Sequence, residues 1–192
     1  QLANIIKQSV LEFSFCAAPT REASTRVPNP VRWTRPDLGW VKLNTDGSSL
    51  GNPGIAGGGG LIRDDNGRWI VGFSRRIGVT SCFLAELWAL RDGLRLCVSR
   101  KFHAVEVEID AKAIVDALNN PRYSNLFVSA IMDDCRTLFS QIPRTCFRHC
   151  YREMNRCADA LARKGGCQAA GFLIFESPPV DVLCFVEADS HG

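Results

Sequence analysis

Residues 40–54 read Trp-Val-Lys-Leu-Asn-Thr-Asp-Gly-Ser-Ser-Leu-Gly-Asn-Pro-Gly, and this stretch decides the fold. Val41, Leu43 and their polar neighbours alternate up to Asp46, which is the period of a strand with one buried face. The glycine-rich segment Gly47–Gly54 that follows predicts a loop. We therefore expect a strand that ends at a carboxylate, beside a loop whose glycines let other groups approach the backbone closely.

Beyond this stretch, the chain predicts more strands and then alternating helices and strands. Strands expected over 56–63 and 68–77 flank the turn signal Asp64-Asp65-Asn66-Gly67, which is typical of a hairpin. The remaining elements expected in chain order are a helix over 81–99, a strand over 105–109, helices over 111–118 and 125–139, a strand over 145–151 and a helix over 155–164. Three meandering strands followed by this alternation predict a mixed α/β sheet with helices packed on it.

The two ends of the chain are less strongly patterned than its middle. We expect residues 1–39 to be an N-terminal extension and linker, with a short helix over 2–15 before several prolines. Residues 167–192 would form a C-terminal tail able to pack back on the domain. The domain itself would be residues 40–166, which is long enough to bury a core without support from disulfide bonds or metal ions.

Composition places the chain among ordinary globular proteins. Its 192 residues are 46% hydrophobic and 22% charged, and the net charge of +3 permits a nucleic-acid partner without arguing for one. No apolar run approaches the roughly 18 residues that a membrane span needs, and the N-terminus has no secretion-signal pattern. Nine cysteines without a C-x-x-C pair favour reduced thiols in an intracellular compartment, nuclear or cytoplasmic.

Four acids stand where a core residue or a strand's end is expected: Asp46, Glu86, Asp110 and Asp159. Glu86 lies on the apolar stripe of its helix, between Phe83 and Leu90, where a carboxylate is costly to bury unless its charge is compensated. A metal ion is one such compensator, and a glutamate at the stripe's edge that reaches solvent is the ordinary alternative. Asp46 and Asp110 end strands whose apolar residues face the other way, so the two acids can meet if the strands are parallel neighbours.

Each of the other acids also has an ordinary interpretation. Asp46 can be a turn residue, and Asp110 can be one more solvated acid because Glu106 and Glu108 share its face. Asp159 can be an acid that complements the dipole at the start of its helix. Taken together, however, the four acids come from two strands and two helices. That arrangement favours a centre with two Mg²⁺ ions about 4 Å apart.

Several motifs occur in the order of a known family. They are Thr45-Asp46-Gly47-Ser48, Gly51-Asn52-Pro53-Gly54, the Gly57–Gly60 run with Leu61-Ile62-Arg63, Ala85-Glu86-Leu87, Glu108-Ile109-Asp110 and residues 155–162. As a set they resemble type 1 ribonuclease H, over about residues 40–166. Residues 40–44 and 149–155 resemble most the plant ribonuclease H-like group, which is often found in non-LTR retroelement polyproteins.

The resemblance implies a ribonuclease H-like α/β fold, with a five-stranded mixed sheet in the order 3-2-1-4-5 and helices on both faces. It implies an endoribonuclease that hydrolyses the RNA strand of RNA–DNA hybrids with two Mg²⁺ ions, or Mn²⁺ in their place. The metal-binding catalytic acids would be Asp46, Glu86, Asp110 and Asp159. The substrate contacts would be Gly47, Ser48, Asn52, Pro53 and Gly54. We expect a monomer whose partners are the hybrid and other domains of a larger polyprotein.

The chain departs from the family's pattern near the last acid. His149 falls in a predicted strand, too early for the loop that carries a catalytic histidine in the bacterial enzyme, so we favour Arg152 as the catalytic residue there. The basic insert that grips the hybrid is replaced by residues 119–124, and Ala111 and Lys112 are atypical, which predicts modest affinity. Candidate phosphate contacts are Arg75, Arg76, Arg152 and Lys164, with solvated surface charge as the alternative.

Two other functions remain open at this point. One is a catalytically weak nucleic-acid-binding domain derived from a retroelement, against which the presence of all four acids speaks. The other is a different nuclease of the same superfold, such as an exonuclease or an integrase. The segments 46–48 and 51–54 favour ribonuclease H over that second alternative.

Overall fold

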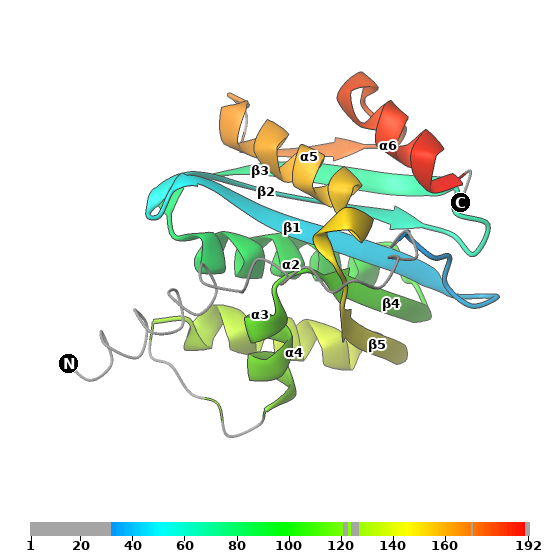
Figure 1. Cartoon of the computed structure of the whole chain (residues 1–192). Helices are drawn as coiled ribbons and strands as arrows, with labels where there is room; N and C mark the ends of the chain where they lie inside the picture. Colours follow the sequence, from blue (N-terminus) through cyan, green and yellow to red (C-terminus); the bar gives the residue numbers. More distant parts are fainter. Residues whose placement is uncertain (1–31, 121–122, 124–126, 170, 191–192) are drawn as a thin grey trace, which may run out of the picture.

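The computed structural model describes residues 32–120, 123, 127–169 and 171–190. The helix predicted over 2–15 therefore lies outside the described residues. The described part is an α/β fold with helices on both faces of one mixed sheet (Figure 1). Among its helices, none combines the length and the apolar character needed to cross a membrane.

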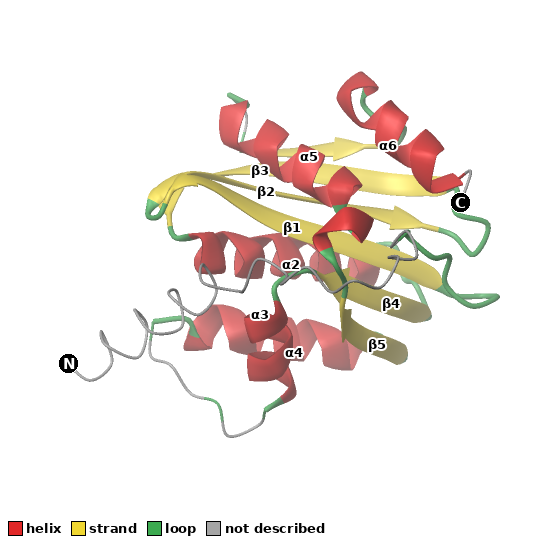
Figure 2. Cartoon of the chain, in the orientation of Figure 1, coloured by secondary structure: helices red, strands yellow, loops and turns green. Residues whose placement is uncertain are grey.

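The sheet has six strands in the order β5-β4-β1-β2-β3-β6 (Figure 2). The strands are β1 (Val41–Gly51), β2 (Gly54–Arg63), β3 (Trp69–Thr80), β4 (Ala104–Ile109), β5 (Arg144–His149) and β6 (Phe172–Phe175). β1, β2 and β3 are antiparallel neighbours, whereas β4 is parallel to β1 and β5 is parallel to β4. The predicted fold class and the order 3-2-1-4-5 are confirmed. The prediction of five strands was one short, because β6 adds an antiparallel strand to the free edge of β3.

The first strand is longer than its sequence pattern predicted. β1 continues through Gly47 and ends at Gly51, because Gly47 pairs with Gly58 and Ser49 pairs with Ala56 across β2. Only the turn between Gly51 and Gly54 remains of the predicted loop. Asp46 therefore lies within a strand and not at its end.

Two layers of helices enclose the sheet. They are α2 (Cys82–Ser99), α3 (Lys112–Asn119), α4 (Ser129–Gln141), α5 (Arg156–Cys167) and α6 (Val180–Ser190), with a short 3-10 helix η1 (Arg152–Met154) before α5. α5 and α6 lie together on one face, and α2 packs on the opposite face with α4 beside it (Figure 1). The main core fills the space between α2, α4 and the sheet, around Leu43, Val107 and Leu90.

The C-terminal segment is part of the folded unit. Val182 of α6 is fully buried in a second small core with Leu61 and Leu161. At the far end of the same helix, Asp189 lies 2.7 Å from the guanidinium of Arg63, a side chain that is 1% exposed. The packed contacts thus extend beyond residue 166, through both β6 and α6.

Glycines let α5 sit directly on β2. A side chain on Gly59 would place its Cβ 2.3 Å from the backbone nitrogen of Ala162, and one on Gly57 would lie 2.1 Å from that of Gly166. Because interiors are close-packed, the helix could not keep this position against a strand with side chains there. The helix that carries Asp159 therefore packs directly on the predicted glycine-rich strand.

We expect Gly59→Ala to destabilise the domain by about 3 kcal/mol, the upper part of the usual range for overpacking. Gly166→Ala is the matched control, because its added Cβ would meet nothing nearer than 3.7 Å. That variant should be neutral or more stable by about 0.4–1 kcal/mol. Urea unfolding of both variants measures the difference. Equal stability of the two would show that the close approach of α5 to β2 is unimportant.

Candidate active site

Three of the predicted acids meet at one place. Asp46 comes from β1, Glu86 from the first turns of α2, and Asp110 follows the last residue of β4. One carboxylate oxygen from each lies within 4.8 Å of the other two. Asp46 and Glu86 are buried, with 6% and 3% of their surface exposed.

Strand register and a missing side chain bring these acids together. Asn44 of β1 is level with Glu108 of β4, so two residues further along the parallel pair Asp46 comes level with Asp110. On α2, the backbone nitrogen of Glu86 would be 2.1 Å from a Cβ on Gly47. The glycine after the first acid therefore lets the start of α2 rest against β1.

The fourth acid lines the same pocket from α5. The pocket has a volume of about 350 Å³ and is lined by Asp46, Gly47, Ser48, Ser49, Cys82, Glu86, Asp110, Arg152, Arg156, Asp159 and Arg163. Asn155 precedes α5 at the predicted cap position, but its side chain does not cap the helix. It donates instead to the backbone oxygen of Thr45 at 2.9 Å. This bond ties the start of α5 to the residue before Asp46.

Burial and mutual repulsion govern the charge of the acids. Burial raises the pKa of Asp46 well above its ordinary value, and the neighbouring Asp110 and Asp159 raise it further. The pKa of Glu86 is raised in the same direction by burial and then by Asp46. Without a cation, the folded protein therefore favours protonated forms of these two carboxyl groups.

The donor set fits a hard divalent cation. Oε2 of Glu86 and Oδ1 of Asp110 are buried without a hydrogen-bond partner. Buried polar atoms are normally paired, so two unpaired carboxylate oxygens beside Asp46 indicate a place for a ligand. Mg²⁺ takes oxygen ligands and keeps several of its waters, which a pocket of this size can hold.

Arginines surround the acids at the pocket. Nε of Arg152 lies 3.2 Å from Oδ2 of Asp110, and a guanidinium nitrogen of Arg163 lies 2.8 Å from Asp159. His149 is the last residue of β5, where its ring contacts Tyr151 at 5.8 Å between centroids. Of the two residues weighed for the catalytic loop, Arg152 lines the pocket and His149 does not.

The other candidate phosphate contacts lie elsewhere. Arg75 pairs with the buried Asp92, Arg76 donates to a backbone oxygen at residue 168, and Lys164 pairs with Asp181. Arg156 and Arg163 also line the pocket, and neither was predicted as a site residue. They lie three residues before and four residues after Asp159, and this helical spacing was the available signal.

Of the predicted substrate contacts, Gly47 and Ser48 line the pocket, together with the unpredicted Ser49 and Cys82. Asn52, Pro53 and Gly54 lie at the turn between β1 and β2. The side-chain oxygen of Asn52 accepts a hydrogen bond of 3.1 Å from the backbone nitrogen of Cys82. Asn52 thus links the turn to the first residue of α2, in addition to any contact with a substrate.

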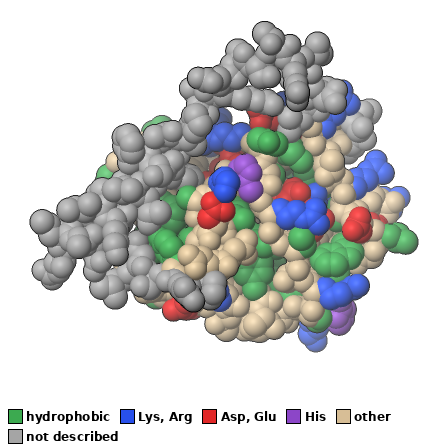
Figure 3. Space-filling view, turned by 60° about the horizontal axis from the view of Figure 1, so that its bottom comes forward, with side chains coloured by type: hydrophobic (Ala, Val, Ile, Leu, Met, Phe, Trp, Pro, Cys, Tyr) green, Lys and Arg blue, Asp and Glu red, His purple; other side chains and the backbone are tan. Residues whose placement is uncertain are grey.

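The charges on the visible face of the molecule are mixed. In Figure 3, Lys and Arg side chains are interspersed with Asp and Glu, and the described surface in this view shows no continuous basic field. This agrees with the small net charge of +3. Electrostatic attraction for a nucleic acid would therefore depend on local arginines and not on the field of a whole face.

Comparisons with known proteins agree on one family. A family model described as reverse transcriptase-like matches residues 44–165. A provisionally named ribonuclease H protein of Arabidopsis thaliana is 37% identical over 167 residues, which is 87% of this chain and 27% of the relative. The chain thus spans only about a quarter of the length of that protein.

Solved structures of ribonucleases H share the fold. The N-terminal RNase H domain of a Mycobacterium tuberculosis protein is 26% identical, with a TM-score of 0.63 over 66% of this chain and 93% of that one. RNase H1 of Halobacterium salinarum is 26% identical, with a TM-score of 0.62 over 66% and 96%. LC11-RNase H1 in complex with an RNA/DNA hybrid is 28% identical, with a TM-score of 0.60 over 65% and 94%.

The acid cluster predicts how stability depends on pH without metal. Burial raises the pKa of Asp46 and Glu86 above their ordinary values of 3.8 and 4.5. At pH values above these ordinary ones, the folded state therefore binds more protons than the unfolded chain. Stability should then fall as pH rises from about 5 toward the raised values. Thermal unfolding in chelator measures this slope.

The double variant Asp46→Asn, Glu86→Gln should be more stable than the native protein near neutral pH and should lose most of the slope. In the native protein, saturating Mg²⁺ should reverse the slope of stability against pH, because the cation binds the deprotonated acids. An unchanged slope in the double variant would mean that other groups set the pH dependence.

Proposed function

Because this chain belongs to the reverse transcriptase-like family, which its relatives identify as ribonuclease H-type, we propose that it is an endoribonuclease that hydrolyses the RNA strand of RNA–DNA hybrids. The observation that carries the proposal is the meeting of Asp46, Glu86 and Asp110 within 4.8 Å, in a pocket that Asp159 also lines. The three acids come from separate elements, and two of their buried oxygens have no partner.

The acids would hold divalent cations. Asp46, Glu86 and Asp110 would hold one Mg²⁺, or Mn²⁺ in its place, and Asp159 with Asp46 would hold a second. When bound, such ions lower the pKa of a water nucleophile and stabilise the leaving oxygen. A cation would also relieve the repulsion that raises the pKa of the two buried acids.

The arginines and the glycine-rich segment would position the RNA strand. Arg152, Arg156 and Arg163 line the pocket, where their guanidinium groups suit phosphate oxygens. Arg152 would exchange its contact with Asp110 for one with the scissile phosphate once a cation neutralises that acid. The backbone at Gly47 and Ser48, with Asn52 at the turn, offers donors and acceptors for a 2′-hydroxyl, the group that distinguishes RNA from DNA.

Other parts of a larger protein would assist binding. The Arabidopsis relative is about three times as long as this chain, since 167 residues cover 27% of it. The mixed charge on the face in Figure 3, the small net charge of +3 and the short segment between α3 and α4 support a modest affinity of this domain alone. We therefore propose that neighbouring domains contribute to holding the hybrid, and that the domain acts as a monomer within that protein.

Asp46→Asn should abolish cleavage while the fold persists, because the amide keeps the shape of the side chain and loses its charge. We expect the rate on labelled hybrid to fall by roughly a thousandfold, equivalent to about 4 kcal/mol of barrier. Asp116→Asn, which changes an exposed acid paired with Lys112, is the control and should cleave normally.

The assay compares hybrid, double-stranded RNA and double-stranded DNA, each with Mg²⁺ and with chelator. Rapid Mg²⁺-dependent cleavage by a folded Asp46→Asn protein would refute the assignment of the site. Binding of hybrid by the native protein without cleavage would instead support a catalytically weak nucleic-acid-binding domain.

The double variant Arg156→Ala, Arg163→Ala should weaken hybrid binding and its dependence on salt. Each phosphate contact contributes close to one unit to the slope of log affinity against log salt, so the slope should fall by about one to two. Titrations in the inactive Asp46→Asn background measure binding without cleavage. Arg136→Ala on α4 is the control, because Arg136 pairs with Asp133 and does not line the pocket. A slope equal to that of the control would exclude these phosphate contacts.

A further inference from the structure

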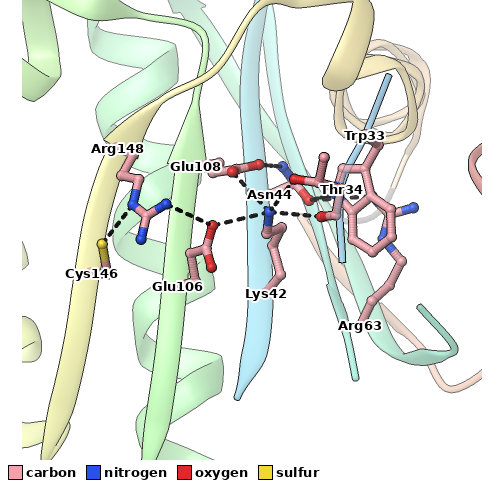
Figure 4. Close-up of polar contacts among 9 residues, drawn as sticks. All are labelled: Trp33, Thr34, Lys42, Asn44, Arg63, Glu106, Glu108, Cys146 and Arg148. Carbon is pink, nitrogen blue, oxygen red and sulfur yellow. Dashed lines mark hydrogen bonds and ion pairs between the residues drawn. The ribbon is translucent and has the colours of Figure 1, made fainter. Parts of the chain in front are cut away.

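β4 carries three acids toward one face, and only one of them joins the candidate site. Glu106, Glu108 and Asp110 alternate along the strand and its end, so their successive Cα atoms are about 7 Å apart. Their sequence pattern alone does not distinguish them. The structure does, because Glu106 and Glu108 are 7% and 5% exposed and both contact residues of β1 (Figure 4).

Lys42 is the centre of these contacts. Its side chain has no exposed surface, and its Nζ lies 2.8 Å from Glu108, 3.0 Å from Glu106 and 2.8 Å from the backbone oxygen of Thr34. Three acceptors therefore satisfy the three protons of the ammonium group. The buried ammonium group therefore lies between two carboxylates of opposite charge, and its removal would leave both of them without this partner.

Asn44 completes the restraint on Glu108. Its side-chain nitrogen lies 3.3 Å from Oε2 of Glu108, whose Oε1 is the atom bound to Lys42. The side-chain oxygen of Asn44 accepts from the indole of Trp33 at 2.9 Å and from Arg63 at 3.3 Å, which fixes the orientation of the amide. Both oxygens of Glu108 are thus held by side chains of β1.

Asp110 differs from its two neighbours on β4. Its Oδ1 is buried without a hydrogen-bond partner, and its Oδ2 accepts from the side chain of Arg152, which is 86% exposed and can move away. The two acids that pair with β1 are therefore held by Lys42, and the third keeps an oxygen available. The division follows the β1–β4 register, in which Lys42 is level with Glu106 and Asn44 is level with Glu108.

We propose that Lys42, assisted by Asn44, is a positioning residue that decides which carboxylate of β4 can bind a divalent cation. It retains Glu106 and Glu108 in the pairing of β1 with β4 and leaves Asp110 for the cation. Without Lys42, a charged Glu108 would turn toward a cation held by Asp46 and Asp110, because it lies one step along the same face. The cation would be bound more tightly, with a wrong ligand set. This inference rests on the proposed metal binding at Asp46, Glu86 and Asp110.

Two double variants with equal charge provide the test. Lys42→Met with Glu106→Gln releases Glu108, whereas Lys42→Met with Glu108→Gln releases Glu106, which is a step further from Asp110. Both keep the net charge of the native chain. Each leaves a single acid without Lys42, with Glu108 still near Asn44 or Glu106 still near Arg148, which favours folding over the single Lys42→Met variant. Arg75→Met is the control for loss of a cation paired with a buried acid, since it releases Asp92 of α2 and no acid of β4.

Calorimetric titration of the full chain with Mg²⁺, below the melting temperature of every variant, gives the main result. The variant that releases Glu108 should bind Mg²⁺ about tenfold more tightly, because a unit charge is added next to the cation. Its rate of hybrid cleavage should be lower by a factor of about ten or more, as expected when the environment of a metal ligand is altered. The variant that releases Glu106, and Arg75→Met, should match the native protein in Mg²⁺ affinity.

Equal Mg²⁺ affinity in the two double variants would overturn the inference, because a merely structural lysine would affect both alike. The proposed function is tested separately by the native protein. If the native chain binds Mg²⁺ without cleaving hybrid, the proposed activity fails while a difference between the double variants still supports the role of Lys42. If the native chain binds no Mg²⁺, both proposals fail.

Discussion

The parallel pairing of β1 with β4 fixes the position of the candidate site. Lys42 and Asn44 face Glu106 and Glu108 across this pair, and the same register brings Asp46 level with Asp110. The ion pairs that stabilise this strand pairing and the acids that form the site occupy successive positions along the same two strands. A slip of two residues would exchange the partners of every step, so the buried ion pairs and the site depend on the same alignment.

Much of the fold could be predicted because its signals are local. Alternation in β1 and β4, the Asn66-Gly67 turn and the helical stripe of α2 each come from a few neighbouring residues. The extension of β1 through Gly47 could not be predicted, since glycine gives no alternation and the strand persists only because β2 pairs with it. β6 also depends on a partner, because its four residues form a strand along the free edge of β3.

The acids of the site were found from sequence, and their surroundings were not. Asp46, Glu86 and Asp110 stood out because each carboxylate occupies an unusual position in its own element. The burial of Glu106 and Glu108 depends on Lys42, which is more than sixty residues away in the chain. No local pattern distinguishes such a buried acid from a solvated one, so these residues looked like an ordinary exposed face.

The contacts of Arg63 bear on how such a domain can be connected to others. The ring of Trp33 lies 3.4 Å from its guanidinium carbon, and Asp189 of α6 lies 2.7 Å from one of its nitrogens. The described chain thus enters and leaves its fold beside a single side chain. Domains whose entry and exit points adjoin can be inserted into another protein with little disturbance of the host's path. This arrangement suits insertion of the domain as one unit between other domains.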